Sequence, residues 1–371
     1  MIRIFHTGDF HLDSAFCRFS HIERARARER QREVFRKMMK YVKDKQYDIL
    51  LISGDLFDTA GVSPETEKCV IDELSELSCP VVIAPGNHDP YSKTLIYSDG
   101  RLPENVYVFN SEEMQVFSFE ELSVQVSGYA FVSDKIDGSP LVGFEPPAFD
   151  GVSLLCAHTE LDAPSSKYAP ISASDIDRCG FSYAALGHVH TCFDVFRFGG
   201  SVAAYCGFPE SRGFDEEGEG GALSVTIEDN GVVALQRIAF GEARYAHDTL
   251  DIRGIDDNRA LISRLEEYLA SFPNKENTAI KLTLTGETEA DFKPDMNIVR
   301  RALADNFIYS EAEDKTTPKI DIQSLELDYT LRGEVFRALR AELDSTDAEK
   351  SETAAEALRL ALLAIDGREL I

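Results

Sequence analysis

Short apolar runs alternate with longer amphipathic segments in the first half of the chain. The runs at 2–7, 49–53 and 81–84 have the length of buried strands, whereas the segments at 22–45 and 64–77 have helical spacing. This alternation is typical of βαβ units that build a largely parallel sheet. Such a sheet carries its functional loops at the carboxyl ends of its strands.

The pattern changes to a period of two between residues 106 and 130, where apolar and polar positions alternate. We expect a second, antiparallel-rich sheet that packs on the first. Further short apolar strands are predicted at 152–157 and 183–186. The polar, glycine-rich stretch at 208–221 is predicted to link two strands of a hairpin.

Near residues 240–247 the pattern changes again and predicts a small α/β second domain. Strands are expected at 249–252, 279–285 and 319–322, and helices at 259–269 and 297–304. The segment 331–363 predicts two helices around an acidic turn at 345–348. Its apolar stripe fits either packing within the chain or docking of a partner helix. The predicted domains are therefore 1–243, 244–330 and a C-terminal helical segment at 331–371.

Polar side chains follow the predicted strands of the first domain directly. They are Asp9, His11, Asp55, Asn87, His88, Asp89, His158, His188 and His190. A single histidine is more often structural than a ligand, but five of the 8 histidines in the chain lie at these strand ends. Packing alone does not explain such a set when carboxylates and an amide accompany it.

The chemistry of this set favours two divalent metal ions. Mixed carboxylate, imidazole and amide ligands suit borderline ions such as Mn²⁺, Fe²⁺ or Zn²⁺. A strand-end carboxylate such as Asp55 can bridge two ions with its two oxygens. Two ions about 3.5–4 Å apart can hold a shared hydroxide and clamp a phosphate. Glycines precede the polar residues and are expected to let the backbone turn sharply and come close to the ions; they are Gly8, Gly54, Gly86 and Gly187.

The order of these motifs resembles the calcineurin-like metallophosphoesterase superfamily. The family pattern D-x-H, G-D-x-x-D, G-N-H-D, H and G-H-x-H stands here at 9–11, 54–58, 86–89, 158 and 187–190. Within the superfamily, the stretches 11–14, 168–170 and 207–216 are similar to SbcD-type DNA-repair exonuclease subunits, especially their YhaO-like bacterial branch. Protein serine/threonine phosphatases fit less well, because their second motif continues with Arg-Gly where this chain has Thr59-Ala60.

The resemblance implies a fold, a ligand set and a mechanism. The fold would be an α/β (α+β) four-layer β-sandwich flanked by helices, followed by a small α/β cap domain and C-terminal helices. Asp9, His11, Asp55 and His190 would hold one metal ion, and Asp55, Asn87, His158 and His188 the other, with Mn²⁺ as the usual ion. His88 would orient the phosphate or protonate the leaving oxygen. Asp58 and Asp89 would tie down ligand imidazoles and the turn.

Charge complicates the choice of substrate. The formal net charge is −27, which is unfavourable for an enzyme that binds nucleic acid. The first 50 residues are nevertheless net positive, and Arg24, Arg26 and Arg28 are candidate DNA contacts unless they form only a solvated helix face. A DNA exonuclease or endonuclease is the first interpretation. The alternatives are a phosphoesterase for small nucleotides or other small phosphodiesters, and a scaffold with a vestigial metal site.

Partners and location follow from resemblance and from composition. The family implies a separate SMC-like coiled-coil ATPase subunit and a possible homodimer, and this sequence contains no phosphate loop of the G-x-x-x-x-G-K-S/T type. We expect no cleaved leader and no membrane segment, since no apolar stretch approaches about 20 residues. The 7 scattered cysteines contain no C-x-x-C motif and indicate reduced thiols in a cytoplasm.

Overall fold

The computed structural model describes residues 1–371 except 59–60, 191–193, 217, 290–291, 366 and 368–371. Thr59-Ala60 and Cys192 therefore lie outside the described residues. The chain divides into two compact units, Met1–Tyr245 and Ala246–Ile371, which are described separately. The three-part division made from the sequence stays a prediction.

The first unit contains a six-stranded sheet in the order β12-β11-β1-β2-β3-β4. Its strands are β12 (Val233–Ala239), β11 (Gly221–Ile227), β1 (Ile2–Thr7), β2 (Ile49–Ile52), β3 (Val81–Ile83) and β4 (Val106–Val108). Strands β1 to β3 are parallel, as the βαβ pattern predicted. Strand β4 joins them in parallel, although the pattern at 106–130 predicted a place in the second sheet, and β11 and β12 add to this sheet in antiparallel fashion. The carboxyl ends of β1, β2 and β3 consequently lie at one edge.

A second six-stranded sheet has the order β5-β6-β7-β8-β10-β9. Its strands are β5 (Gln115–Phe119), β6 (Val124–Gly128), β7 (Val152–His158), β8 (Tyr183–Gly187), β10 (Ser201–Tyr205) and β9 (Val195–Phe198). The prediction of an antiparallel-rich sheet was wrong, because the four central strands are parallel and the outer pairs β5–β6 and β9–β10 are antiparallel. Side chains alternate with period two in both kinds of sheet, so the sequence pattern did not reveal strand direction.

The glycine-rich stretch 208–221 was also misassigned. It does not join two strands of a hairpin, because it leaves β10 in the second sheet and enters β11 in the first. Glycine and polar residues identified a loop correctly, but local turn chemistry carries no information about which sheet the next strand joins.

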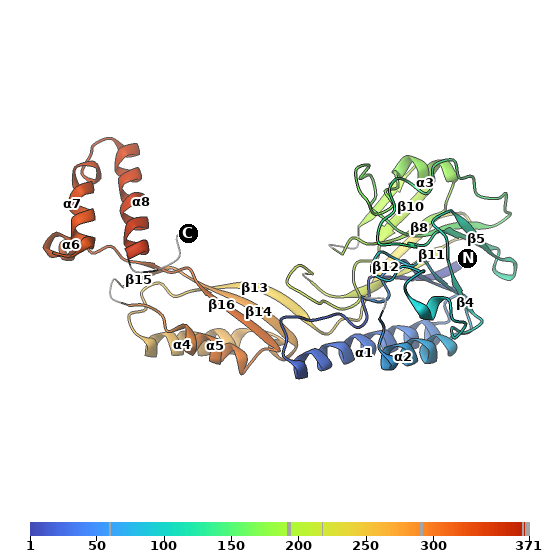
Figure 1. Ribbon diagram of the computed structural model, residues 1–371, viewed down its shortest axis with the longest axis horizontal. Helices are drawn as coiled ribbons and strands as arrows, with labels where there is room; N and C mark the ends of the chain where they lie inside the picture. The colour runs from blue at the N-terminus through green and yellow to red at the C-terminus, as the bar shows by residue number, and fades with distance from the viewer. Residues whose placement is uncertain (59–60, 191–193, 217, 290–291, 366, 368–371) are drawn as a thin grey trace. The chain divides into compact units, whose positions relative to one another are not determined.

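The two sheets form the middle layers of a four-layer sandwich, which confirms the expected fold class. Successive residues of β1 point to opposite faces, so Ile4 packs between the sheets while Phe5 packs under the helices. Helices α1 (His21–Lys45) and α2 (Pro64–Ser75) cover the outer face of the first sheet. Helix α3 (Ala173–Cys179) contributes Ile176 to the outer core of the second sheet. Figure 1 shows these helices on opposite sides of the unit.

Helix α1 is positioned by its sequence at both ends. Ser20 and Glu23 form a capping box at its start, and Gln46 ends it in the left-handed conformation. Its buried stripe packs against the first sheet and contains Ala27, Gln31, Val34, Phe35, Met38, Met39 and Val42. The polar member of this stripe, Gln31, donates to the carbonyl oxygen of His11 at 2.9 Å. The helix therefore also holds the loop that follows β1.

The second unit is built on a three-stranded sheet in the order β13-β14-β16. Its elements are β13 (Arg244–Asp251), α4 (Asn258–Ser271), β14 (Thr278–Thr285), α5 (Met296–Ala304) and β16 (Tyr309–Asp314), followed by a short pair β15 (Glu287–Thr288) and β17 (Thr317–Pro318). The predicted strand at 319–322 was wrong. Asp321 instead caps helix α6 (Ile322–Leu327) by accepting from the N–H groups of Gln323 and Ser324.

The two C-terminal helices predicted from the sequence are present as α7 (Leu331–Leu343) and α8 (Ala348–Ile365). Phe336 of α7 is buried in one cluster with Leu358 and Leu362 of α8 and with Leu325 of α6. Most of the apolar stripe thus packs within the chain, although Leu331 at its start is 63% exposed. Among the described residues, no helix combines the length and apolarity needed to cross a bilayer.

Candidate metal centre

The predicted ligands come together where both sheets end. Beyond β1 and β2 the chain continues as two paired loops, in which the N–H of Asp9 donates to the carbonyl of Gly54 and the N–H of His11 to the carbonyl of Asp55, both at 2.9 Å. The backbone N–H of His188, after β8, donates to both carboxylate oxygens of Asp9 at 3.1 Å. Loops from the two sheets are thereby fixed to each other.

Donor atoms of the first predicted ligand set (Asp9, His11, Asp55 and His190) lie close together. The Nε2 atoms of His11 and His190 lie 3.3 Å apart. Asp9 Oδ1 lies 3.4 Å from His190 Nε2, and Asp55 Oδ2 lies 3.4 Å from His11 Nε2. Two atoms that bind one ion at about 2.1 Å are themselves about 3.0–3.4 Å apart, so these separations fit a shared ion.

The other set converges on His158. Its Nε2 lies 2.9 Å from Asn87 Oδ1, 3.2 Å from His188 Nδ1 and 3.3 Å from Asp55 Oδ2. Asp55 Oδ2 consequently faces both sets. We expected Asp55 to face the two sets with one oxygen each, but its Oδ1 accepts the backbone N–H of His88 at 2.9 Å.

Hydrogen-bond partners determine which imidazole nitrogens are free. Nδ1 of His11 lies 2.9 Å from the Asp58 carboxylate, and Nδ1 of His158 lies 3.0 Å from the Ser53 carbonyl oxygen. Nδ1 of His190 lies 2.9 Å from the Glu216 carboxylate. These partners only accept hydrogen bonds, so each Nδ1 carries a proton and Nε2 is the nitrogen that can present a lone pair to an ion. Lone pairs of nitrogen and oxygen that face one another at about 3 Å repel unless a proton or a metal ion lies between them, and this donor set therefore fits divalent ions.

The pKa shifts of the buried side chains also indicate that this centre needs positive charge. Burial opposes ionisation of Asp55, but the imidazoles of His158 and His11 hold the pKa of its carboxyl below the usual range. Burial would lower the pKa of His158, but Asp55 and Asp9 raise it to about 9, so without an ion a proton takes the place of the metal at this imidazole. Burial and the neighbouring His158 lower the pKa of His188 to about 4. The centre is a place where buried carboxylates need positive charge close by.

Several residues adopt strained backbone conformations at the centre. Asp9, His11 and Asp55 have φ angles of 51°, 46° and 47°, and His188 has a φ angle of 98°. Residues other than glycine rarely occupy this left-handed region, and such strain gathers at functional sites.

Two glycines are required for different reasons. Gly54 has a φ angle of +98°, and a Cβ there would lie 2.3 Å from His158 Nδ1. No such angle is needed at Gly86, where a Cβ would lie 2.1 Å from Asp55 Oδ1. Of the two reasons that we predicted for these glycines, sharp turning and close approach, sharp turning applies at Gly54. At Gly86 the reason is the close approach of the backbone to Asp55.

His88 lies at the open side of the centre. Its side chain is 46% exposed, its Nδ1 is 3.7 Å from Asp58 Oδ1, and its ring contacts that of His11 at a centroid distance of 4.7 Å. Asp89 is fully buried and accepts from the N–H groups of Gly86 and Phe57 at 2.8 and 3.1 Å. Asp58 thus orients an imidazole, whereas Asp89 holds the turn.

Two residues of the centre were missed from the sequence. Glu216 and Arg212 belong to the 208–221 loop, whose glycines and mixed charges gave no ligand pattern. Burial opposes ionisation of Glu216, but hydrogen bonding to His190 and the charge of Arg212 lower its pKa to about 2. A second acidic residue near the centre, Glu160, lies 3.4 Å from His188 Nε2 through its Oε1 atom.

The candidate DNA contacts on α1 differ in exposure. Arg28 is half-buried and its Nε donates to the carbonyl of Ser14 at 2.9 Å. Arg24 is also half-buried, and its Nη2 lies 3.4 Å from the carbonyl oxygen of Phe19. Arg26 is exposed. The arginine run is therefore partly used to hold the loop after β1, and Arg26 is the member of the three that faces solvent.

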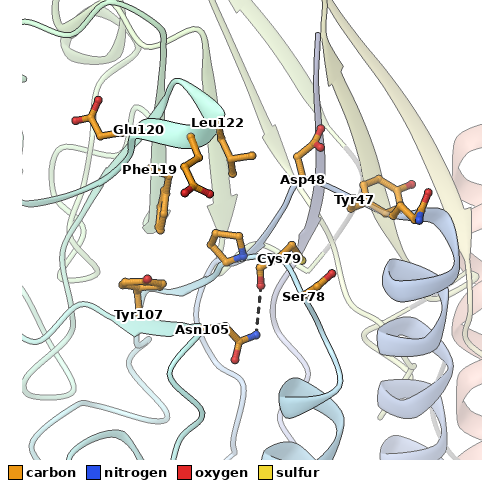
Figure 2. A pocket seen from close by; sticks show the side chains of 12 residues that line it. Tyr47, Asp48, Ser78, Cys79, Asn105, Tyr107, Phe119, Glu120 and Leu122 are labelled. Carbon is orange, nitrogen blue, oxygen red and sulfur yellow. Dashed lines mark hydrogen bonds between the residues drawn. The ribbon is translucent and has the colours of Figure 1, made fainter.

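A separate cavity of about 600 Å³ opens at the other end of the first sheet. Figure 2 shows Tyr47 and Asp48, which precede β2, near Cys79 before β3 and Phe119 at the end of β5. These are the amino ends of the parallel strands, and Asn105 there donates to the carbonyl of Cys79 at 3.3 Å. The cavity is thus not part of the centre at the carboxyl ends.

A four-layer sandwich with a candidate divalent-metal site at the carboxyl edge of both sheets is typical of metal-dependent phosphoesterases. The chain belongs to the calcineurin-like phosphoesterase family, whose model matches residues 2–192. Membership implies a phosphoester hydrolase that uses divalent metal ions.

Relatives agree with the expected branch at modest identity. The chain is 25% identical over 293 residues to the uncharacterized metallophosphoesterase YhaO of Bacillus subtilis, covering 76% of this chain and 71% of that protein. It is 25% identical over 349 residues to the DNA double-strand break repair protein Mre11 of Saccharolobus solfataricus, covering 89% and 86%. It is 26% identical over 267 residues to the SbcD component of the nuclease SbcCD of Bacillus subtilis, covering 62% and 66%. The predicted resemblance to SbcD-type and YhaO-like proteins is confirmed.

Gly86→Ala should weaken metal binding, because the added methyl group displaces the Asp55 carboxylate. Overpacking of this kind costs about 1–3 kcal/mol of folding free energy as well. Isothermal titration with Mn²⁺ and thermal unfolding in EDTA would measure the two effects. Gly200→Ala is the matched control, since a Cβ at Gly200 meets no atom within 4 Å. Wild-type Mn²⁺ affinity in Gly86→Ala would show that the close approach is unimportant.

Proposed function

We propose that this protein is a two-metal phosphodiesterase that hydrolyses DNA as a nuclease of the DNA-repair type. The observation that carries the proposal is the meeting of two ligand sets at Asp55 Oδ2, with the exposed imidazole of His88 beside them. A shared carboxylate oxygen suits a pair of ions that act on one phosphate.

The two sets assign the ligands. Asp9, His11, Asp55 and His190 would hold the first ion, and Asp55, Asn87, His158 and His188 the second. The oxygen and nitrogen donors fit Mn²⁺, which we propose as the ion, and they also fit Fe²⁺ or Zn²⁺. When bound, the pair would supply a nucleophile at neutral pH and offset the charge of the phosphate.

The chain's own residues would orient and protonate the substrate. His88 is close enough to the ligands to reach a phosphate held there and exposed enough to meet a substrate from solvent. We propose that it fixes one phosphate oxygen and donates a proton to the leaving oxygen. Asp58 lies beside both His88 and His11, so one carboxylate would orient the proton donor and a metal ligand together.

DNA is supported as the substrate by the relatives. Mre11 is named as a double-strand break repair protein and SbcCD as a nuclease, and the match to Mre11 extends over most of both chains. A small phosphodiester is the second candidate, because a net charge of −27 opposes the approach of a polyanion.

A separate SMC-like ATPase subunit is a further part of the proposal. The SbcD relative is by its name one component of a complex. Exposed apolar side chains gather in this chain around the start of α7, and they are Ile322, Leu327, Tyr329 and Leu331. Such a cluster fits a protein partner, and the proposed contact lies there. The homodimer expected from the resemblance stays a prediction.

Asp55→Asn should abolish binding of the ion pair and lower phosphodiesterase activity together, because one oxygen serves both ligand sets. The loss of metal affinity and activity should exceed the roughly 10–100-fold loss that follows mutation of a residue that only contacts a metal ligand. Metal content after gel filtration and hydrolysis of bis-p-nitrophenyl phosphate would measure both. Asp150→Asn, at an exposed position, is the control. An active Asp55→Asn variant with two ions would refute the assignment.

His88→Gln should keep both ions but lower turnover by about 10²–10⁴-fold, the usual contribution of a general acid. The assay compares end-labelled DNA and bis-p-nitrophenyl phosphate in Mn²⁺ and in EDTA. Metal-dependent DNA cutting that the variant loses would support the nuclease proposal. Hydrolysis of the ester by the wild type with DNA left intact would favour the small phosphodiester.

Arg26→Ala should reduce the salt dependence of DNA binding. Loss of one phosphate contact lowers the slope of log K against log salt by about 0.9. Fluorescence anisotropy of labelled DNA at several salt concentrations would measure the slope. Lys40→Ala removes one exposed charge from a later turn of the same helix and serves as the control. Equal slopes for Arg26→Ala and wild type would leave Arg26 as a solvated surface residue.

A further inference from the structure

The loop between β10 and β11 places a buried ion pair beside the first ligand set. Arg212 donates through Nε to Glu216 Oε1 at 3.0 Å, and its backbone N–H donates to Glu216 Oε2 at 2.7 Å. The side chains of Arg212 and Glu216 are only 18% and 3% exposed. Glu216 Oε1 is also the atom that accepts from His190 Nδ1 at 2.9 Å.

The same guanidinium reaches the other histidine ligand of this set. Arg212 Nη1 lies 3.4 Å from Asp58 Oδ1, and that oxygen accepts from His11 Nδ1 at 2.9 Å. Arg212 therefore lies between two carboxylates, each of which fixes one imidazole. Arg212 Nη2 also lies 3.2 Å from His190 Nδ1, but this nitrogen has the closer Glu216 carboxylate as its acceptor.

The stability of the fold does not by itself explain the buried Arg212–Glu216 ion pair. Taking two charges out of water costs several kcal/mol per ion, and apolar pairs of similar volume often stabilise a fold as well or better. The pair does have a role at the metal centre. Glu216 and Asp58 place two negative charges beside the histidine ligands, and the Arg212 cation between them offsets their repulsion.

We propose that Arg212 and Glu216 are positioning residues that hold His11 and His190 in the orientation and tautomer needed by the first ion. The inference rests on the proposed two-metal function and deepens it. Neither residue needs to touch the substrate. The loop that crosses between the two sheets thus completes a metal site whose ligands all come from other loops.

The test replaces the pair while measuring metal binding and folding separately. Glu216→Leu removes the acceptor of His190, Glu216→Gln keeps an acceptor oxygen without the charge, and Arg212→Met with Glu216→Leu replaces the pair by apolar side chains. Mn²⁺ binding is followed by isothermal titration and by electron paramagnetic resonance, which distinguishes a coupled ion pair from a single ion. Thermal unfolding in EDTA reports the fold.

We expect Glu216→Leu to weaken one of two Mn²⁺ sites by about 10–100-fold, and Glu216→Gln to weaken it less. The double variant should keep or raise the unfolding temperature in EDTA, yet lose the coupled signal at Mn²⁺ concentrations that saturate the wild type. Glu219→Gln, in the same loop and 44% exposed, is the control and should bind like the wild type.

Wild-type Mn²⁺ affinity and coupling in the double variant would overturn the inference. A wild-type protein that binds two ions but leaves DNA intact would contradict the nuclease proposal and leave the positioning role standing. A wild-type protein that binds no Mn²⁺ pair would overturn the two-metal centre and the positioning role together.

Discussion

Mutual repulsion among buried acceptor atoms is the constraint on which the centre depends. The Nε2 atoms of three imidazoles converge on Asp9 and Asp55 at separations near 3.3 Å, and each imidazole has its Nδ1 proton held by an acceptor on the far side. Such an arrangement is unfavourable without cations and strongly favourable with them. Metal binding and the local fold are therefore linked, and the surrounding structure must hold the loops until ions arrive.

The sandwich supplies that support. Both sheets are buried on both faces, so their strands have little freedom to shift, and their carboxyl edges fix where each loop begins. Backbone hydrogen bonds between the loops after β1 and β2 continue the sheet into the site. Left-handed conformations at Asp9, His11 and Asp55 store strain that a packed core can offset.

Basic residues of the first unit also support the loops and carboxylates around the centre. Much of the arginine run on α1 is turned inward, where Arg28 holds the loop after β1 and Arg32 contacts Asp13 and Glu29. Arg212 plays a comparable part at the ligands. The protein thus uses basic residues to stabilise an acidic centre, and leaves Arg26 among the predicted DNA contacts exposed.

The sequence by itself determined the parallel arrangement of β1 to β3 and most of the residues that meet at the centre. It could do so because the ligands lie at or shortly after the carboxyl ends of strands β1, β2, β3, β7 and β8, and parallel strands end at a common edge. Only the tertiary structure decided the direction of the central strands in the second sheet, the position of β16, and the crossing of the 208–221 loop between sheets. It also decided that Arg212 and Glu216 join the centre. Side-chain alternation is the same in parallel and antiparallel strands, and strand pairing depends on contacts between residues far apart in the chain, which a local pattern does not record.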